Sequence, residues 1–378
     1  MRIVILSSAR FHLCDLAREL YQRGHEVTFL SYLPSRLARR FGLPKHVARS
    51  LFGTVAPLLV ARRLTKKGSL QRHLDRLIML RVDHAAVRRL AECDVFIGIS
   101  GVAVESAASA KRRMGASIWI ERGSVHILDQ QAILAKARCR RRSEVTEWSV
   151  ERESRSYAAA DVIVVPSAHV KESFVRRGFE DAMLFRNPYG VDLSMFPRTV
   201  APGGARPTIL FVGSWSFEKG CDVLEAAWRG IRGARLLHVG PVGDVKLPRD
   251  KDFEHCDPVP QWELSRYYGQ AHILALPSRQ DGFGMVLSQG LASGLRIVSS
   301  AMTGGPDLKA MLGEQDAISI VQPGSVVDLE RGLREQLSRA LLDSGLRNPL
   351  GAARDRLSWE SYAERYEAEL VQRESRRP

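Results

Sequence analysis

Cysteine is scarce in this sequence, and the cysteines that occur are isolated from one another. The chain has five cysteines in 378 residues, at positions 14, 93, 139, 221 and 256. No two of them form a Cys-x-x-Cys pair, which excludes a zinc ribbon and a thioredoxin-like redox motif. An odd number of widely spaced cysteines also excludes a disulfide scaffold and is typical of a reducing compartment.

Long apolar runs are missing as well. The first run, residues 3–6, has four residues, too few for the core of a signal peptide, which needs about 7–15. No uncharged apolar run approaches the roughly 18 residues that suggest a membrane-spanning helix. We therefore expect a cytoplasmic protein, either soluble or peripheral on the inner face of the cytoplasmic membrane.

Basic residues outnumber acidic residues in the first half of the chain but not in the second half. The net charge is +14; residues 1–200 contain 34 lysines and arginines against 19 acidic residues, and residues 201–378 contain 22 against 23. This asymmetry points to an anionic partner for one domain: anionic lipid, a pyrophosphate-linked acceptor or nucleic acid. General solubility is the alternative. We expect no nucleic acid, because zinc-finger spacing, an RNP aromatic pattern and a clear helix-turn-helix are all absent.

One basic region contains an apolar segment. Residues 51–61 are mostly apolar, with basic residues before them at positions 36, 39, 40, 45 and 49 and after them at 62, 63, 66 and 67. Eleven residues cannot span a bilayer, but an apolar segment between cations can enter the membrane interface. A helix packed on the domain core explains the same pattern equally well.

Short apolar runs alternate with helical patterns along the whole chain, as in doubly wound α/β domains. The runs typical of buried strands lie at residues 2–7, 27–30, 94–98, 117–120, 161–166, 208–213, 236–240, 273–277 and 296–300. Residues 202–207 have linker composition. We therefore predict two Rossmann-like domains that face each other across a cleft, with ligands at the carboxyl ends of their strands.

The most informative segment lies between residues 277 and 294, where a strand is followed by Gly282 and Gly284 and then by a helical pattern. Glycine lets a ligand approach the backbone closely, and the amino end of a helix attracts anions. Asp281 and Gln289 bracket this turn, and both side chains can hydrogen bond to hydroxyl groups. The segment predicts a site for an anionic, hydroxyl-bearing ligand.

Here the sequence resembles a known family, the retaining nucleotide-sugar glycosyltransferases of family 4, which have the two-domain GT-B fold. That family has an acidic residue, Gly-Phe-Gly, and a glutamate eight residues after the first acid; residues 281–289 resemble this signature. Further segments resemble family motifs in the expected order: residues 187–192 with Phe196, residues 212–213 with 218–220, and residues 303–307. The resemblance covers nearly the whole chain.

The resemblance implies roles on the donor side of the cleft. Lys219 would hold the departing diphosphate, and His126 and Asp281 would act beside the donor sugar, which makes these three the predicted catalytic residues. A structural role is the alternative for His126. The predicted binding residues for a UDP- or GDP-sugar are Gly213, Ser214, Lys219, Val259, Asp281, Gly282, Phe283, Gly284, Met285, Val286 and Gln289.

The resemblance also implies an acceptor side and a reaction path. Arg10, His12 and Arg122 would face the acceptor, although the loop after the first strand lacks the Gly-Gly pair often found in the family. The anomeric configuration would be retained through a front-face path in which the departing phosphate takes the acceptor's proton. That path needs no carboxylate nucleophile, no metal and no other cofactor.

Three positions depart from the family pattern. Ser214 stands where the family usually has an arginine on the diphosphate, and Gln289 stands where it has the second glutamate. Glutamine keeps one carbonyl acceptor and adds N–H donors, so it can still bind ribose hydroxyls with a changed preference. Asp281 is one methylene shorter than the family's glutamate. These departures leave the donor sugar and base open.

We therefore predict a hexosyltransferase-type enzyme that transfers sugar to a glycan or polyprenyl-diphosphate-linked acceptor in bacterial surface polysaccharide or lipopolysaccharide synthesis. Residues 1–198 would bind the acceptor, residues 199–357 the donor, and residues 358–378 would form a helix that crosses back to the first domain. The alternatives are a catalytically impaired scaffold protein, a nucleotide-sugar epimerase, and a phosphorylase with a pyridoxal cofactor. A Rossmann dehydrogenase is disfavoured because no Gly-x-Gly-x-x-Gly follows the first strand.

Overall fold

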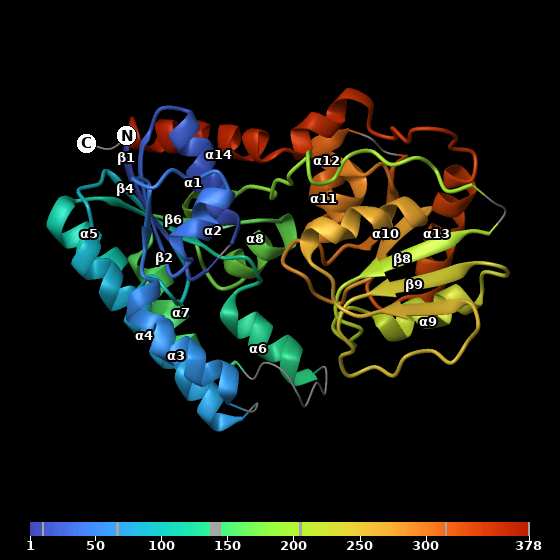
Figure 1. Cartoon of the computed structure of the whole chain (residues 1–378), viewed down its shortest axis with the longest axis horizontal. Helices are drawn as coiled ribbons and strands as arrows, with labels where there is room; N and C mark the ends of the chain where they lie inside the picture. Colours follow the sequence, from blue (N-terminus) through green and yellow to red (C-terminus); the bar gives the residue numbers. More distant parts are fainter. Residues whose placement is uncertain (10, 66–67, 137–144, 204–205, 314–315, 377–378) are drawn as a thin grey trace.

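The chain forms two parallel β-sheets, one in each half of the sequence (Figure 1). The computed structural model describes residues 1–9, 11–65, 68–136, 145–203, 206–313 and 316–376. Most strand residues of the central strands are buried, as expected for parallel sheets with helices on both faces. The prediction of two α/β domains is confirmed. Cys139 and residues 204–205 of the predicted linker lie outside the described residues.

The first sheet has the strand order β3-β2-β1-β4-β5-β6-β7, with every neighbouring pair parallel. Ile3 of the first strand pairs with Val27 on one side and Val95 on the other. The strand order therefore reverses beside β1, and such a switch point is where open α/β sheets bind ligands. The strands are β1 Arg2–Leu6, β2 Glu26–Ser31, β3 Ala48–Ser50, β4 Val95–Ile99, β5 Ser117–Glu121, β6 Val162–Val165 and β7 Leu184–Arg186.

Helices connect these strands and cover the sheet. They are α1 His12–Gln22, α2 Ser35–Arg40, α3 Phe52–Leu64, α4 Ser69–Arg89, α5 Glu105–Met114, α6 Ile127–Lys136, α7 Glu147–Ala159, α8 Ala168–Val175 and the 3₁₀ turn η1 Asp181–Met183. Helices α3 and α4 pack against each other along one edge of the domain (Figure 1).

The apolar segment at residues 51–61 lies mainly in α3. In this helix only Val55 is fully buried, whereas Phe52, Val60 and Leu64 are 40%, 59% and 81% exposed. The helix therefore packs on the domain through one side and leaves apolar side chains uncovered on another. Lys66 and Lys67 lie outside the described residues. Among the helices that the structure describes, none is long and apolar enough to cross a membrane.

The second sheet has the order β10-β9-β8-β11-β12-β13 and is also parallel throughout. Its order reverses beside β8, so the two switch points belong to equivalent strands of the two domains. The strands are β8 Thr208–Val212, β9 Arg235–Val239, β10 Phe253–Cys256, β11 Ile273–Leu276, β12 Arg296–Ser300 and β13 Ile318–Val321. The helices are α9 Cys221–Arg229, η2 Gln261–Glu263, α10 Leu264–Gln270, α11 Met285–Ala292, α12 Gly305–Leu312, α13 Val326–Ala340 and η3 Gly351–Leu357.

The last helix, α14 Trp359–Glu374, returns to the first domain and packs along α1 (Figure 1). Glu367 of α14 accepts hydrogen bonds from His25 Nε2 at 2.8 Å and from Arg23 Nη1 at 3.0 Å. The chain thus passes between the domains twice, after β7 and before α14. These two passages are joined where the Val191 amide donates to the Leu357 carbonyl at 2.8 Å.

Candidate active site between the two domains

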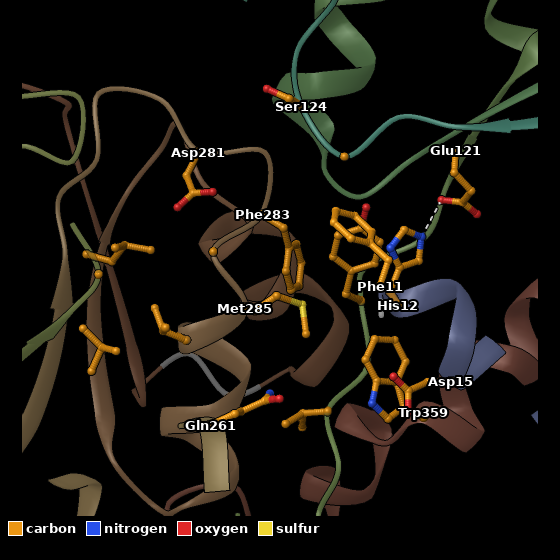
Figure 2. A pocket seen from close by; sticks show the side chains of 18 of the residues that line it. Phe11, His12, Asp15, Glu121, Ser124, Gln261, Asp281, Phe283, Met285 and Trp359 are labelled. Atoms are coloured by element: carbon orange, nitrogen blue, oxygen red, sulfur yellow. Dashed lines mark hydrogen bonds and ion pairs between the residues drawn. The ribbon is translucent and has the colours of Figure 1, made fainter. Parts of the chain in front are cut away.

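A cavity of about 760 Å³ lies between the domains (Figure 2), and its lining includes the last residues of strands from both sheets. Glu121 ends β5, and Val212 and Leu276 end β8 and β11. The first domain and the interdomain passages contribute Phe11, His12, Asp15, Ile99, Ser100, Glu121, Arg122, Gly123, Ser124, Tyr189, Val191, Asp192, Met195 and Trp359; the second contributes Val212, Gly213, Lys219, Gln261, Leu276, Asp281, Phe283, Gly284, Met285 and Val286.

Lys219 and Asp281 form an ion pair in this cavity. Lys219 Nζ lies 2.7 Å from Asp281 Oδ2. Burial lowers the pKa of Lys219, but the Asp281 carboxylate outweighs burial and raises that pKa above its ordinary value. Gly220 follows in a left-handed conformation, φ +72°, and a Cβ there would lie 2.2 Å from the Pro277 carbonyl oxygen. The loop therefore places the charged Lys219 ammonium at the cavity, and the turn that follows it can be formed only with glycine at position 220.

Arg279 holds the loop that carries this lysine. Its guanidinium donates two hydrogen bonds to Asp222, at 2.6 and 2.8 Å, and one to the Phe217 carbonyl at 2.7 Å. Its backbone amide donates to the Glu218 carbonyl at 2.8 Å. Because a bidentate arginine–carboxylate pair fixes direction as well as distance, Arg279 is suited to position Lys219.

The glycine segment, residues 281–284, lies beside that loop, because Asp281 pairs with Lys219. Gly284 adopts φ +80°, and a Cβ there would meet a Leu276 methyl carbon at 2.5 Å. Helix α11 begins directly after it, at Met285, and its first residues line the cavity. The positive end of the helix dipole therefore faces the same space as the Lys219 ammonium, an arrangement that attracts an anion.

Several predicted donor residues do not line the cavity. Those that do are Gly213, Lys219, Asp281, Phe283, Gly284, Met285 and Val286; those that do not are Ser214, Val259, Gly282 and Gln289. Gln289 is 4% exposed, and its Oε1 accepts a hydrogen bond from the Tyr268 hydroxyl at 2.8 Å. A contact between Gln289 and the donor stays a prediction.

His126 does not reach this cavity. It is buried among Tyr157, Phe174 and Phe179, with ring centroids 5.2, 5.1 and 5.7 Å away, and its backbone amide donates to Ser173 Oγ. Burial, helped by nearby cationic side chains, lowers the pKa of His126 to about 4. This placement favours the structural role that the sequence left open and not a contact with the donor sugar.

The predicted acceptor residues are placed differently from one another. Arg122 lines the cavity, but its guanidinium is buried and bonded to Glu153 Oε1 at 2.5 Å and to Gln130 Oε1 at 2.7 Å. His12 lines the cavity, and its Nε2 lies 3.0 Å from Glu121 Oε2. Figure 2 shows this pair as the one linked by a dashed line. Arg10 lies outside the described residues.

Sequence reasoning gave no role to Glu121 or Tyr189, although both line the cavity. Glu121 is the last residue of β5 and follows the three apolar residues Ile118–Ile120; a carboxylate in that position is the signal that could have identified it. Tyr189 packs between His12 of the first domain and Phe283 of the second, at 4.4 and 5.4 Å between ring centroids. It therefore connects the two walls of the cavity.

Metal-ion ligands are not grouped in the described part of the chain. No three or more histidines, cysteines, aspartates or glutamates lie together there in a way that could hold a metal ion. Lys219 and Arg122 line the cavity, and the amino end of α11 adds the positive end of a helix dipole to it.

Comparison with known proteins agrees with this architecture. Residues 206–339 match the model of the family described as glycosyl transferases group 1. The chain is 26% identical over 206 residues to sulfoquinovosyl transferase of Arabidopsis thaliana, covering 50% of this chain and 40% of that protein. It is 29% identical over 181 residues to D-inositol 3-phosphate glycosyltransferase of Xylanimonas cellulosilytica, covering 40% of this chain and 43% of that one. The chain thus spans less than half the length of these relatives.

Solved structures match over the whole chain. Sucrose-phosphate synthase from Thermosynechococcus elongatus gives a TM-score of 0.68 at 17% identity, covering 98% of this chain and 99% of that chain. Anabaena HepE, solved with UDP and glucose, gives 0.66 at 13%, covering 98% and 100%. The lipopolysaccharide outer core galactosyltransferase WaaB gives 0.63 at 15%, covering 99% and 100%. The chain has the GT-B fold, and residues 206–339 in its second half are similar to the group 1 glycosyl transferases.

Proposed function

We propose that this protein is a retaining glycosyltransferase of family 4 that transfers a sugar from a UDP- or GDP-sugar to a glycan or a polyprenyl-diphosphate-linked acceptor. The observation that carries the proposal is the Lys219–Asp281 pair beside the amino end of α11, in a cavity between two Rossmann-like domains. The match of residues 206–339 to group 1 glycosyl transferases supports it, as do structural neighbours solved with UDP-sugar components.

The proposed chemistry follows from charge. When the bond between the anomeric carbon and the phosphate oxygen breaks, negative charge develops on the departing diphosphate. Lys219 and the helix dipole of α11 are fixed where that charge grows, so they stabilise the transition state without rearranging. Asp281, paired with Lys219, is placed to accept a hydrogen bond from a sugar hydroxyl. The proposal includes no metal and no other cofactor.

The acceptor side is proposed from charge and exposure. Residues 1–200 carry the whole basic excess of the chain, and α3 exposes Val60 and Leu64 near Arg62 and Arg63. A surface of this kind binds anionic membranes. We place the protein at the inner face of the cytoplasmic membrane, in surface polysaccharide or lipopolysaccharide synthesis. One structural neighbour, WaaB, is titled a lipopolysaccharide galactosyltransferase.

Thermal unfolding with UDP, GDP, ADP and CMP, each added alone, tests the donor site. A nucleotide at about 100 times its dissociation constant adds about 2.7 kcal/mol of stability, which raises Tm by several degrees. We expect one nucleoside diphosphate to give this shift in the wild type and a much smaller one in K219A. A chain that responds to none of them would contradict the proposal.

A second candidate is a binding protein with this fold that has lost turnover. The observations that favour it are Ser214 at the position of the family's usual arginine and the engagement of Gln289 Oε1 by Tyr268. Nucleotide binding without release of nucleoside diphosphate from any UDP- or GDP-sugar would support this candidate over the transferase.

A further inference from the structure

Two histidines lie side by side in the second sheet and reach the loop that follows β8. His238 of β9 and His255 of β10 are partners in the strand register, so their side chains leave the same face of the sheet. Their Nδ1 atoms are 2.9 Å apart, and His238 Nε2 lies 2.9 Å from the Gly213 carbonyl oxygen. His238 is fully buried, and Gly213 lines the cavity. The pair therefore connects the interior of the second domain to the wall of the site.

The proton positions on these rings follow from their partners. Burial lowers the pKa of His238 to about 4, so its ring is neutral at pH 7 and carries one proton. A carbonyl oxygen can only accept, so this proton is on Nε2, and Nδ1 of His238 keeps a lone pair. His255 Nδ1 is then the donor between the two rings. Asp257 does not compete for the proton of His255, because its Oδ1 is 3.6 Å from Nε2, beyond hydrogen-bond distance.

The hydrogen bond from His238 determines which way the Gly213–Ser214 peptide points. The described residues include no cis peptide bond, so the carbonyl and the amide of each peptide point in opposite directions. The Gly213 carbonyl points toward β9, where it meets His238, and β8 lies between β9 and β11. The Ser214 amide therefore points toward the β11 side, where Asp281 lines the cavity.

The Ser214 amide is free to bind a ligand, whereas its neighbours are not. The amide before it, of Gly213, donates to the Val239 carbonyl at 3.0 Å. The amide after it, of Trp215, donates to the Pro241 carbonyl at 2.9 Å. The Ser214 amide itself donates to no acceptor within the described residues. Since the amino end of α11 faces the same cavity, a free amide here adds a second fixed donor for an anion.

The backbone at Gly213 does not fix this direction by itself. Gly213 has φ +144°, and glycine has no side chain to restrict rotation of the adjoining peptide. A Cβ at Gly240 would lie 2.2 Å from the Gly213 carbonyl oxygen, so Gly240 leaves room for the carbonyl but offers it no hydrogen bond. The donor that keeps the carbonyl in place is His238 Nε2.

We propose that His238 and His255 are positioning residues for the diphosphate of the bound nucleotide. His238 holds the Gly213 carbonyl and thereby directs the Ser214 amide at the diphosphate. His255 fixes the tautomer of His238 that this hydrogen bond requires. The inference rests on the proposed function, because it takes a nucleoside diphosphate as the ligand of the cavity. It adds a backbone donor to the cation of Lys219.

The test compares ligands with and without a diphosphate. Dissociation constants are measured for UDP against uridine and for GDP against guanosine. We expect H238L to weaken binding of the nucleoside diphosphate by about tenfold, as for loss of a hydrogen bond to a charged group, and to leave binding of the nucleoside near wild type. H238Q should restore most of the loss, because the side-chain amide of glutamine can donate to the Gly213 carbonyl.

H272L is the matched control. His272 is buried in the same domain, and its Nδ1 accepts a hydrogen bond from the Thr208 amide at 3.0 Å, at the amino ends of the strands and away from the cavity. H272L should lower Tm without changing the preference for diphosphate over nucleoside. Equal weakening of both ligands in H238L, or no weakening, would overturn the inference. A wild type that binds no nucleoside diphosphate would instead refute the proposed function.

The tautomer gives a readout that needs no ligand. In the ligand-free protein at pH 7, ¹⁵N spectra of the imidazoles should show the His238 ring neutral and protonated at Nε2. In H255L the form protonated at Nδ1 should gain population, and binding of the nucleoside diphosphate should weaken. A wild-type His238 ring protonated at Nδ1 would overturn the inference even if H238L failed to fold, because the Gly213 carbonyl would then have no donor.

Discussion

Lys219 is the residue on which the proposed donor chemistry depends most. We expect K219A to lower the release of nucleoside diphosphate by about 10²–10³-fold, the loss typical when one preorganised electrostatic group is removed. The fold should persist, because the side chain of the remaining partner, Asp281, is 21% exposed and can be hydrated. Released nucleoside diphosphate and Tm are the two measurements.

K251A is the matched control for this prediction. Lys251 is an exposed lysine of the same domain and does not line the cavity, so its removal should leave turnover unchanged. Near-normal turnover in K219A would show that the cation is not used on the diphosphate.

For His126 we predict an effect on the stability of the folded protein and not on turnover. Its pKa is lowered to about 4 in the folded protein, chiefly by burial, against about 6.5 in the unfolded chain. Between these values the unfolded state binds the proton and the folded state does not, so stability falls as the pH drops from about 6.5 to about 4. The contribution of His126 to this loss is about 2 kcal/mol at pH 5.

Denaturant unfolding at pH 7 and pH 5 measures this effect. In H126N the difference between the two pH values should shrink by about 2 kcal/mol, because the group that binds the proton on unfolding is gone. Burial also lowers the pKa values of His169 and His238 to about 4, so in H126N these two residues should still contribute to the difference in unfolding free energy between the two pH values. An unchanged difference in H126N would mean that His126 is protonated in the folded protein.

The sequence predicts side chains of the site well where the signal is local. Lys219 and Asp281 lie in short segments beside glycines that the turn geometry requires, and both residues line the cavity. His126 shows where prediction from the sequence stops, because a histidine after a strand can point into the cleft or into the core. Its direction is determined by packing against Tyr157 and Phe174, which the sequence does not reveal. The pairing of His12 with Glu121 depends on the order of the strands.

At the scale of elements, α3 is the helix whose role is least explained by the fold alone. If it meets a membrane, removing its exposed apolar side chains should weaken binding. We expect V60D/L64D to reduce sedimentation with vesicles of 30 mol% phosphatidylglycerol in phosphatidylcholine by about tenfold or more, since it removes apolar burial and adds repulsion from anionic lipid.

V327D/L342D is the control for that experiment. Val327 and Leu342 are 81% and 84% exposed and lie in the second domain, so the same change of charge and apolar area is made elsewhere. Equal loss in the two double variants would indicate general electrostatic repulsion, and no loss in V60D/L64D would remove the proposed role of α3.

Whether a strand or helix could be predicted from the sequence depends on how it is buried. Central strands such as β1 and β11 are buried on both faces, so they read as continuous apolar runs in the sequence. Strands β3 and β10 are edge strands, with sequences Ala-Arg-Ser and Phe-Glu-His-Cys, and carry no such signal. Helix α4 is long and contains many arginines, so the helical spacing of its apolar residues is hard to recognise in the sequence.

For the whole molecule, the contact between the glycine segment and the first domain defines how far the cavity closes. A Cβ at Gly282 would lie 1.8 Å from the Gly123 carbonyl oxygen, so no side chain fits between the two backbones. Ser167 Oγ also donates to the Gly282 carbonyl at 2.6 Å, and Gln280 Nε2 donates to Ser124 Oγ at 3.0 Å. The domains touch here through backbone and short polar side chains.

G282A should therefore hold the domains apart. We expect a larger radius of gyration by small-angle X-ray scattering and turnover lowered by at least about tenfold, because a misplacement of about 1 Å can reduce catalysis strongly. G203A is the control: a Cβ there meets nothing within 4 Å. A scattering profile of G282A identical to wild type would show that these backbones are not in contact in solution.

The two joined passages between the domains have a mechanical consequence. A single linker would let one domain rotate freely about the chain, whereas two passages bonded at Val191 and Leu357 restrict that rotation. Rotation that draws the two passages apart must break this bond or separate α14 from α1. We therefore expect that cutting either passage would widen the range of orientations that the two domains can adopt.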